Sequence, residues 1–369
     1  MRVQCLQDHL LREVQVVSRA ISNRASMPIL SNILLDAGGG KLKVSATDLE
    51  LGIESQISAD VTENGSITLP ARIFGDIVSN LPVASVNIDV GEGDTRARIS
   101  CENIKFEILG LPAADFPVMP QDGGEIIAQI DAGLMRTMIR QTSFAVSTDE
   151  TRPFLTGVYL VLEDGDGRLV ATDGGRLALR KMKLPGKVKG KISAIVPSKT
   201  MAELVRVLGG AEDQVTIASH ENQLLFTVGG MRFISRLIAG QFPPYEKVIP
   251  SEFKQRIKVG TERLLRAVRR ASITARDSAN VVRLSAAERT LTVSSNTPEV
   301  GKAQEEIDVQ AEGETMQVAF NAKFLLDALI NMDVPEVMFE LTGSLSPGVL
   351  RPVDHAEYVY VLAPVRVYG

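Results

Sequence analysis

The chain has 369 residues, of which 44% are hydrophobic and 23% are charged, and its net charge is -5. No apolar run approaches the roughly 20 residues of a membrane span, and the acidic balance argues against a chain that coats itself non-specifically in nucleic acid. Cys5 and Cys101 are too few for a disulfide framework or a four-ligand zinc site, and we interpret both as buried thiols. Gln4, Gln7 and Asp8 interrupt the segment that a secretory signal would need, so we expect a cytoplasmic protein.

Each third of the chain is predicted to open with an amphipathic helix and to carry a second helix near its middle. In chain order these helices cover residues 8–22, 71–81, 132–144, 198–208, 262–275 and 321–332. Pro70, Pro197 and Asn321 precede or cap the second helix of each third. Short alternating runs rich in Val, Ile, Leu and Thr read as antiparallel strands, joined by turns such as residues 91–94 and 229–230. Two helices and about eight strands per third predict an α+β domain whose helices cover one side of antiparallel sheets.

A repeat with a period of about 125 residues organises these elements. The same order, a basic strand, a polar pair and a second strand, occurs three times, at residues 41–54, 168–181 and 290–302. The polar pairs are Thr47-Asp48, Thr172-Asp173 and Asn296-Thr297. We therefore predict three domains of one kind, at residues 1–126, 127–253 and 254–369. A domain that is repeated in this way usually serves as a scaffold.

Basic side chains gather on the helices, opposite the apolar faces. In residues 262–275, Leu264, Leu265 and Val268 share one side and four arginines share the other. The six helical windows hold 13 Lys or Arg and seven Asp or Glu, so they carry +6 and the remainder carries -11; the windows are residues 8–22, 71–81, 131–144, 198–208, 261–276 and 320–332. A charged helix face is ordinarily just a solvated face. Six such helices in an acidic chain favour a basic surface directed at a polyanion.

Signatures of catalysis are missing from the sequence. No G-x-x-x-x-G-K-[ST] phosphate loop occurs, and residues 186–191 have the wrong spacing for one. The three histidines are far apart and follow no metal-binding pattern: His9, His220 and His355. Asp48, Glu50 and Asp173 could hold magnesium, but Asp48 and Asp173 occupy equivalent turns of different repeats. We expect no catalytic residue, no metal and no cofactor, and keep a metal-dependent nucleic-acid enzyme as the less favoured alternative.

Several motifs, in a fixed order along the whole chain, resemble one family. They are MPILSNILL, ATDLEL, LPAADFP, RPFLTGV, VATDGGRLA, SRLIAGQFPPYEKVIP and YVYVLAPVRV, at residues 27–35, 46–51, 111–117, 152–158, 170–178, 235–250 and 358–367. The chain is similar to the β subunit of bacterial DNA polymerase III, the sliding clamp. The resemblance implies the DNA clamp fold, in which a head-to-tail homodimer closes a ring with helices inside and sheets outside. With helix axes about 10 Å apart, six helices leave a hole of about 9 Å and twelve leave about 28 Å, so only two subunits admit a duplex.

The resemblance also implies residues that face double-stranded DNA and residues that join the subunits. A lining of Lys and Arg attracts phosphates without reading sequence, which permits sliding. The expected lining is Arg12, Arg19, Arg24, Arg72, Arg136, Arg140, Lys199, Arg206, Arg263, Arg266 and Arg270, with Arg24 and Arg72 added on the resemblance alone. The expected subunit interface contains Phe106 and Ile273, and Thr274 stands where an aliphatic residue is common.

In this family a hydrophobic pocket between the second and third domains receives short motifs, typically Gln followed by Leu and Phe. The implied partners are the polymerase III α subunit, the clamp loader and other clamp-motif proteins of repair and replication. The positions carried over are Leu155, Thr172, Gly174, Gly175, Arg176, Leu177, Pro243, Lys247, Val248, Asn321, Val361, Leu362, Ala363, Pro364, Val365 and Arg366. Gly175 replaces a common histidine and Lys247 a common arginine, so we expect a different peptide preference. Without the resemblance, residues 361–365 are better interpreted as a simple edge strand of the core.

Overall fold

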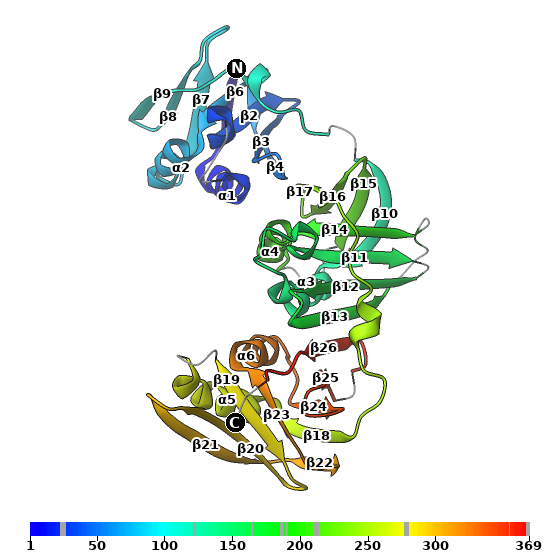
Figure 1. Cartoon of the computed structure of the whole chain (residues 1–369). Helices are drawn as coiled ribbons and strands as arrows, with labels where there is room; N and C mark the ends of the chain where they lie inside the picture. Colours follow the sequence, from blue (N-terminus) through cyan, green and yellow to red (C-terminus); the bar gives the residue numbers. More distant parts are fainter. Residues whose placement is uncertain are drawn as a thin grey trace. The chain divides into compact units, whose positions relative to one another are not determined.

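The computed structural model describes residues 1–22, 27–120, 123–163, 165–184, 188, 191–209, 214–276, 280–353 and 355–366. The chain divides into two compact units, each of which is discontinuous in sequence. Figure 1 shows the helices and strands, coloured along the sequence. Unit 1 comprises residues 1–135 and 203–237, and unit 2 comprises residues 136–202 and 238–369. The central third of the chain therefore contributes strands to both units.

The described strands of unit 1 form two antiparallel sheets. The first has the strand order β5 (Asp60–Glu63), β1 (Arg2–Leu6), β7 (Ser85–Val90), β8 (Arg96–Cys101), β9 (Ile104–Leu109). The second has the order β10 (Glu125–Asp131), β15 (Gln214–His220), β16 (Gln223–Val228), β17 (Met231–Arg236), β4 (Leu51–Ser58), β3 (Lys41–Thr47), β2 (Asn32–Gly38), β6 (Gly65–Pro70). Strands β17 and β4 join two distant stretches of sequence, with Phe233 opposite Ile53 and Ile234 opposite Gly52.

Unit 2 repeats this construction in its described residues. Its larger sheet has the order β14 (Ile192–Pro197), β11 (Gly157–Glu163), β12 (Asp166–Thr172), β13 (Arg176–Lys183), β26 (Tyr358–Leu362), β25 (Gly348–Pro352), β24 (Glu336–Leu341), β18 (Gln255–Gly260), β22 (Gln310–Gly313). Its smaller sheet has the order β21 (Gly301–Asp308), β20 (Thr290–Thr297), β19 (Val281–Ala286), β23 (Met316–Asn321). Here β13 and β26 make the long-range junction, with Leu177 opposite Val361.

All six predicted helices are present, and each begins within one residue of its predicted start. They are α1 (Gln7–Val17), α2 (Ala71–Asn80), α3 (Ala132–Thr142), α4 (Ser198–Val207), α5 (Thr261–Ala275) and α6 (Ala322–Ile330). The predicted cap is confirmed at Asn321, whose side chain accepts a hydrogen bond from the Lys323 backbone N–H at 2.9 Å. Helix α1 packs on β3 and β4, and α5 packs on β19, β20 and β21, so the α+β prediction is confirmed. No described helix is long and apolar enough to cross a membrane.

Two of the repeated polar pairs, Thr47-Asp48 and Thr172-Asp173, lead from a strand into a hairpin turn, whereas Asn296-Thr297 ends strand β20 just before its turn. The Asp48 carboxylate accepts a hydrogen bond from the backbone N–H of Leu51 at 2.8 Å. In the second repeat, Asp173 accepts the equivalent bond from Arg176 at 3.0 Å. The third turn differs, because Thr297 instead donates its hydroxyl to a backbone carbonyl of α5 at 2.6 Å. Short aspartate side chains thus close two of the turns by bonding to their own backbone.

Both cysteines are buried and free, as predicted. Cys5 lies in β1 and Cys101 ends β8, so each points from a strand into the core of the same sheet. Burial raises the pKa of the Cys5 thiol to about 12. A thiol that stays protonated at neutral pH is a poor nucleophile, which fits a packing role.

Candidate nucleic-acid interface and docking cavity

Helix α5 has two faces of opposite character. Leu264, Leu265 and Val268 are buried, whereas the four arginines of the helix are exposed. The separation follows from the 3.6-residue period, which places residues three and four apart on one side. The predicted basic stripe is therefore present on the surface.

Carboxylates accompany three of these arginines, a feature that the sequence did not reveal. The Arg263 guanidinium lies 3.4 Å from the carboxylate of Asp308, and Arg266 lies 2.6 Å from Glu262. Arg270 donates two hydrogen bonds to Glu305, at 2.7 and 2.5 Å, and this pairing lowers the pKa of Glu305. Exposed pairs of this kind contribute little stability, so the arginines can exchange a carboxylate for a phosphate at low cost.

The other predicted DNA-facing residues lie on the remaining helices or next to them. Arg12, Arg72, Arg136 and Arg206 are exposed, and Arg19, Arg140 and Lys199 are half-buried. Among the described residues Arg12, Arg72 and Arg136 form no ion pair, whereas Arg206 pairs with Glu203 at 3.3 Å and Arg140 approaches Asp333 at 3.9 Å. Arg24 lies outside the described residues.

Unit 2 contains a cavity of about 410 Å³, hereafter the unit 2 cavity. Its apolar walls include Leu155, Leu177 and Val361, which are themselves buried in one hydrophobic cluster. Ten of the sixteen predicted pocket residues line it: Leu155, Thr172, Gly174, Gly175, Arg176, Leu177, Pro243, Val248, Val361 and Ala363. Strands β12, β13 and β26 and the loop after Gly240 bring these residues together from distant parts of the sequence.

Six predicted positions do not line this cavity: Lys247, Asn321, Leu362, Pro364, Val365 and Arg366. The inclusion of Leu362 was wrong because successive residues of a strand face opposite sides, so Leu362 is fully buried away from Val361. Asn321 is engaged as the cap of α6, and the backbone N–H of Val365 bonds to Ala319 at 2.8 Å. Lys247 is an exposed residue of the short 3₁₀ turn that begins at Tyr245.

The sequence reading missed five lining residues: Arg152, Phe154, Pro244, Tyr245 and Pro347. Four of them lie inside motifs that carried the family resemblance, RPFLTGV and SRLIAGQFPPYEKVIP, so the signal was available. Tyr245 is buried and packs edge-on against Phe242, which in turn stacks on Tyr159 with ring centroids 4.7 Å apart. This aromatic group supports one side of the cavity and keeps its shape.

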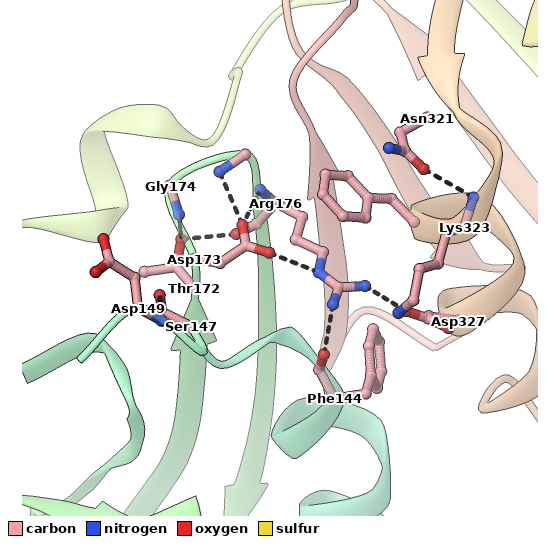
Figure 2. A network of polar contacts seen from close by, with 12 residues as sticks. Phe144, Ser147, Asp149, Thr172, Asp173, Gly174, Arg176, Asn321, Lys323 and Asp327 are labelled. Carbon is pink, nitrogen blue, oxygen red and sulfur yellow. Dashed lines mark hydrogen bonds and ion pairs between the residues drawn. The ribbon is translucent and has the colours of Figure 1, made fainter. Parts of the chain in front are cut away.

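Arg176 lines the cavity, but its guanidinium is held in a buried polar network (Figure 2). Its Nε donates to Asp173 at 3.0 Å, Nη1 to Asp327 at 2.6 Å and Nη2 to the backbone oxygen of Phe144 at 2.8 Å. The guanidinium also lies over the ring of Phe324, 4.4 Å from its centroid. This single side chain thus connects the β12–β13 turn at the cavity to α6 and to the 3₁₀ turn (Ser143–Ala145) that follows α3.

The charge of Arg176 is strongly favoured in this setting. Burial alone would lower its pKa, but the hydrogen bond to Asp327 and the interactions with Tyr360 and Asp173 outweigh burial and raise the pKa. The arginine therefore stays charged, and both carboxylates have a permanent partner.

The predicted interface residues lie on or beside sheet edges. Phe106 is 40% exposed on β9, the edge strand of the five-stranded sheet of unit 1. Ile273 is 60% exposed on α5, which packs on β21, the edge strand of the smaller sheet of unit 2. Thr274 is half-buried, with its hydroxyl 2.6 Å from that of Ser295. The hydroxyl of Thr274 is thus directed into unit 2.

Acidic residues do not gather into a metal site in the part of the chain that the structure describes. No group of three or more His, Cys, Asp or Glu side chains there could hold an ion. Asp48 and Asp173, the carboxylates considered for magnesium, are each engaged in closing their own turn.

Known proteins match this chain along its length. Residues 1–120, 129–244 and 246–366 match the N-terminal, central and C-terminal domains of the DNA polymerase III beta subunit. A beta sliding clamp of Staphylococcus epidermidis is 33% identical over 98% of both chains. Among solved structures, a DNA polymerase sliding clamp from Bacillus subtilis has a TM-score of 0.96 and 37% identity over the whole of both chains. A Pseudomonas aeruginosa clamp bound to griselimycin has a TM-score of 0.94 and 31% identity, again over both whole chains.

Repeated α+β domains with basic helix faces define the class of DNA sliding clamps. The chain belongs to the bacterial DNA polymerase III β subunit family. Members of this family are non-catalytic processivity factors, so membership confirms the prediction that the chain is not an enzyme and disfavours the metal-dependent alternative.

Proposed function

We propose that two copies of this chain close head to tail into a ring that encircles double-stranded DNA in the cytoplasm. Each copy would contribute three domains, residues 1–126, 127–253 and 254–369. The observation that carries the proposal is the set of exposed arginines on the helices of a chain whose net charge is -5. Such a lining attracts the phosphates of DNA of any sequence and leaves the ring free to slide along it.

Two exposed sheet edges support the closure. An unpaired edge strand offers a row of free backbone groups and must be covered or protected. Strand β9 carries the exposed Phe106 and Leu109, and β21 lies next to Ile273 on α5. Pairing β9 of one copy with β21 of the other would satisfy both edges and bury these apolar side chains, and a heterologous contact of this kind closes into a ring.

The unit 2 cavity supports a second role as a docking site. Its volume of about 410 Å³ is enough for one or two apolar side chains of a peptide. A small apolar anchor of this kind suits weak partners that exchange. We assign to it short segments of the polymerase III α subunit, the clamp loader and other clamp-motif proteins of repair and replication.

Retention on circular DNA tests the ring. The protein should stay on nicked circular DNA and leave after linearisation, because only a ring depends on free ends. Reversing Arg263, Arg266 and Arg270 to Glu should shorten retention and reduce the salt dependence of binding, by up to about 0.9 in the logarithmic slope for each phosphate that is no longer neutralised. A matched variant with Lys41, Lys181 and Lys183 reversed on strands has the same charge change and should retain the wild-type slope. The ring would be rejected if the salt dependence fell equally in both variants, or if the protein stayed on the DNA after linearisation.

Peptide binding tests the docking role separately. A fluorescent peptide with Gln, Leu and Phe at its anchor positions should lose at least about ten-fold in affinity when Val361 is replaced by Asp, because a charge would enter the apolar wall. Deleting the last five residues takes no described residue from the cavity lining, but it removes the bond from the Val365 N–H to Ala319 that holds the chain beyond Ala363, so it should also abolish binding while the dimer persists. Peptide affinity that survives both changes would reject the assignment of this cavity.

A further inference from the structure

Unit 1 contains a second cavity, of about 550 Å³, that the proposed tethering role does not use. We call it the unit 1 cavity. Its floor is apolar, with Met119 and Ile234 buried there beside Gly52. The cavity lies where the loop after Phe116 crosses strands β4 and β17, and all of its lining residues belong to unit 1.

The internal repeat relates the unit 1 cavity to the unit 2 cavity, residue by residue. Thr47, Leu49, Glu50 and Gly52 precede Thr172, Gly174, Gly175 and Leu177 by 125 residues. Residues 117–119 precede residues 243–245 by 126, and Ile234 and Arg236 precede Val361 and Ala363 by 127. The strand register agrees, because Gly52 pairs with Ile234 as Leu177 pairs with Val361. The fold has therefore built the same kind of cavity twice.

The two cavities differ in charge. In the unit 1 cavity, Glu50 replaces Gly175 and Arg236 replaces Ala363, and Glu221 adds a further carboxylate at the rim. Within the described residues these three exposed charges form no ion pair. By contrast, none of the described residues that line the unit 2 cavity is Asp or Glu.

Two further observations indicate a bound partner. The side-chain oxygen of Gln223, a lining residue, is buried and accepts no hydrogen bond in the described structure. Leu49 has a φ of +78°, in the left-handed region that a leucine rarely adopts, where the equivalent Gly174 has +94° at no steric cost. The strained turn holds an exposed leucine at the mouth of the cavity, and backbone strain of this kind gathers at binding sites.

We propose that the unit 1 cavity binds a short extended peptide that carries an aliphatic residue next to Lys or Arg. The aliphatic side chain would pack on Met119 and Ile234. The basic side chain would face Glu50 and Glu221, and a peptide N–H would donate to the Gln223 oxygen. Because the described lining of the unit 2 cavity holds no carboxylate, the two cavities select different sequences, so one chain can hold two kinds of partner at once.

The ε-methyl NMR resonances of the methionines test this proposal in the full-length chain. Met119 reports on the floor of the unit 1 cavity, and the probes are acetyl-Lys-Leu-Leu-Arg-amide and acetyl-Glu-Leu-Leu-Glu-amide. The basic peptide should shift Met119 saturably with a Kd below about 1 mM, as expected for a weak exchangeable contact. The double variant Glu50→Gln with Glu221→Gln should weaken binding by about five-fold or more, since exposed charge pairs make contributions of this size.

Matched controls decide between outcomes. Glu92→Gln with Glu102→Gln makes the same charge change elsewhere on unit 1 and should leave the affinity unchanged. Val361→Asp, in the unit 2 cavity, should also leave the Met119 shift unchanged. The proposal is overturned if Met119 does not respond at about 5 mM basic peptide, if the acidic peptide shifts it equally, or if the two double variants behave alike. Failure of clamp retention on circular DNA would leave this peptide titration unaffected.

Discussion

Replacing Arg176 by Met should destabilise unit 2 and weaken the unit 2 cavity. The side chain is 6% exposed and donates to Asp173, to Asp327 and to the backbone oxygen of Phe144. Methionine preserves most of the volume but none of these bonds. The variant would leave two carboxylates and one carbonyl without their partner, so the expected effect comes from unsatisfied polar groups rather than from an empty space.

The magnitude follows from the geometry. Removing one partner of a buried ion pair costs about 3–5 kcal/mol. The side chains of Asp173 and Asp327 are 20% and 25% exposed, and Lys323 remains 2.8 Å from Asp327, so both carboxylates can be partly rehydrated or paired. We therefore expect the lower end of the range, about 3 kcal/mol. The double variant Arg176→Met with Asp327→Asn should lose less unfolding free energy than the sum of the two single variants. Each single variant leaves the other charged group without its partner, and the double variant does not.

Tyrosine fluorescence during urea unfolding measures this loss selectively. The chain has no Trp, and four of its five Tyr lie in the described part of unit 2 whereas Tyr368 lies outside the described residues, so the signal of these four reports on that unit. The matched control is Arg152→Met. Arg152 lines the same cavity, but its side chain is 45% exposed and, among the described residues, its one ion pair is with Asp149, so we expect a change of at most about 1 kcal/mol. Equal effects of the two substitutions, or a loss at Arg176 below about 1 kcal/mol, would refute the reasoning.

Other features give further expected outcomes. Gly313→Ala should cost about 3 kcal/mol or more in urea unfolding, because its φ is +92° and a Cβ would meet a backbone oxygen at 2.0 Å, whereas Gly93→Ala, with φ +68° and open space, should cost about 1 kcal/mol. The hydrogen bond from Arg270 lowers the pKa of Glu305 in the folded protein, so this pair stabilises the fold above the unfolded pKa of about 4.5, and the stabilisation is lost as the pH falls through the lower folded value. The Glu305→Gln variant should therefore lose less folding stability between pH 7 and pH 3 than the wild type. An equal loss in the two proteins would contradict the pairing with Arg270. Cys5, with a pKa of about 12, should react with a thiol reagent at pH 8 far more slowly than in unfolded protein, and rapid labelling of the native chain would show that β1 opens.

Local patterns in the sequence predicted local structure well. The spacing of leucines and arginines in α5 defined its buried and exposed faces, because a helix converts sequence position directly into direction. The Thr-Asp pairs predicted hairpin turns, since an aspartate can bond to the backbone N–H groups that follow it. Asn321 marked the start of α6 for the same reason.

Interactions between distant residues could not be predicted from such patterns. The carboxylates that face Arg263 and Arg270 come from β21, more than 30 residues later, and nothing in either segment indicates the pairing. The pairing of β13 with β26 is equally hidden, and it decides that Val361 faces the cavity while Leu362 does not. Ten residues that line the unit 2 cavity were named through the family resemblance. The unit 1 cavity was missed although the 125-residue offset, already visible in the sequence, maps onto it.

The strand pairings β4–β17 and β13–β26 also bear on how the protein could be divided for expression or for grafting. Each sequence repeat supplies only part of a sheet, and the missing neighbour comes from another repeat. A fragment of residues 127–253 would lack β4 and β26, so the edges of β17 and β13 would be unpaired, and unpaired strand edges promote self-association. The stretch of sequence that repeats is therefore not a stretch that folds alone, and a fragment expressed from residues 127 to 253 should be insoluble.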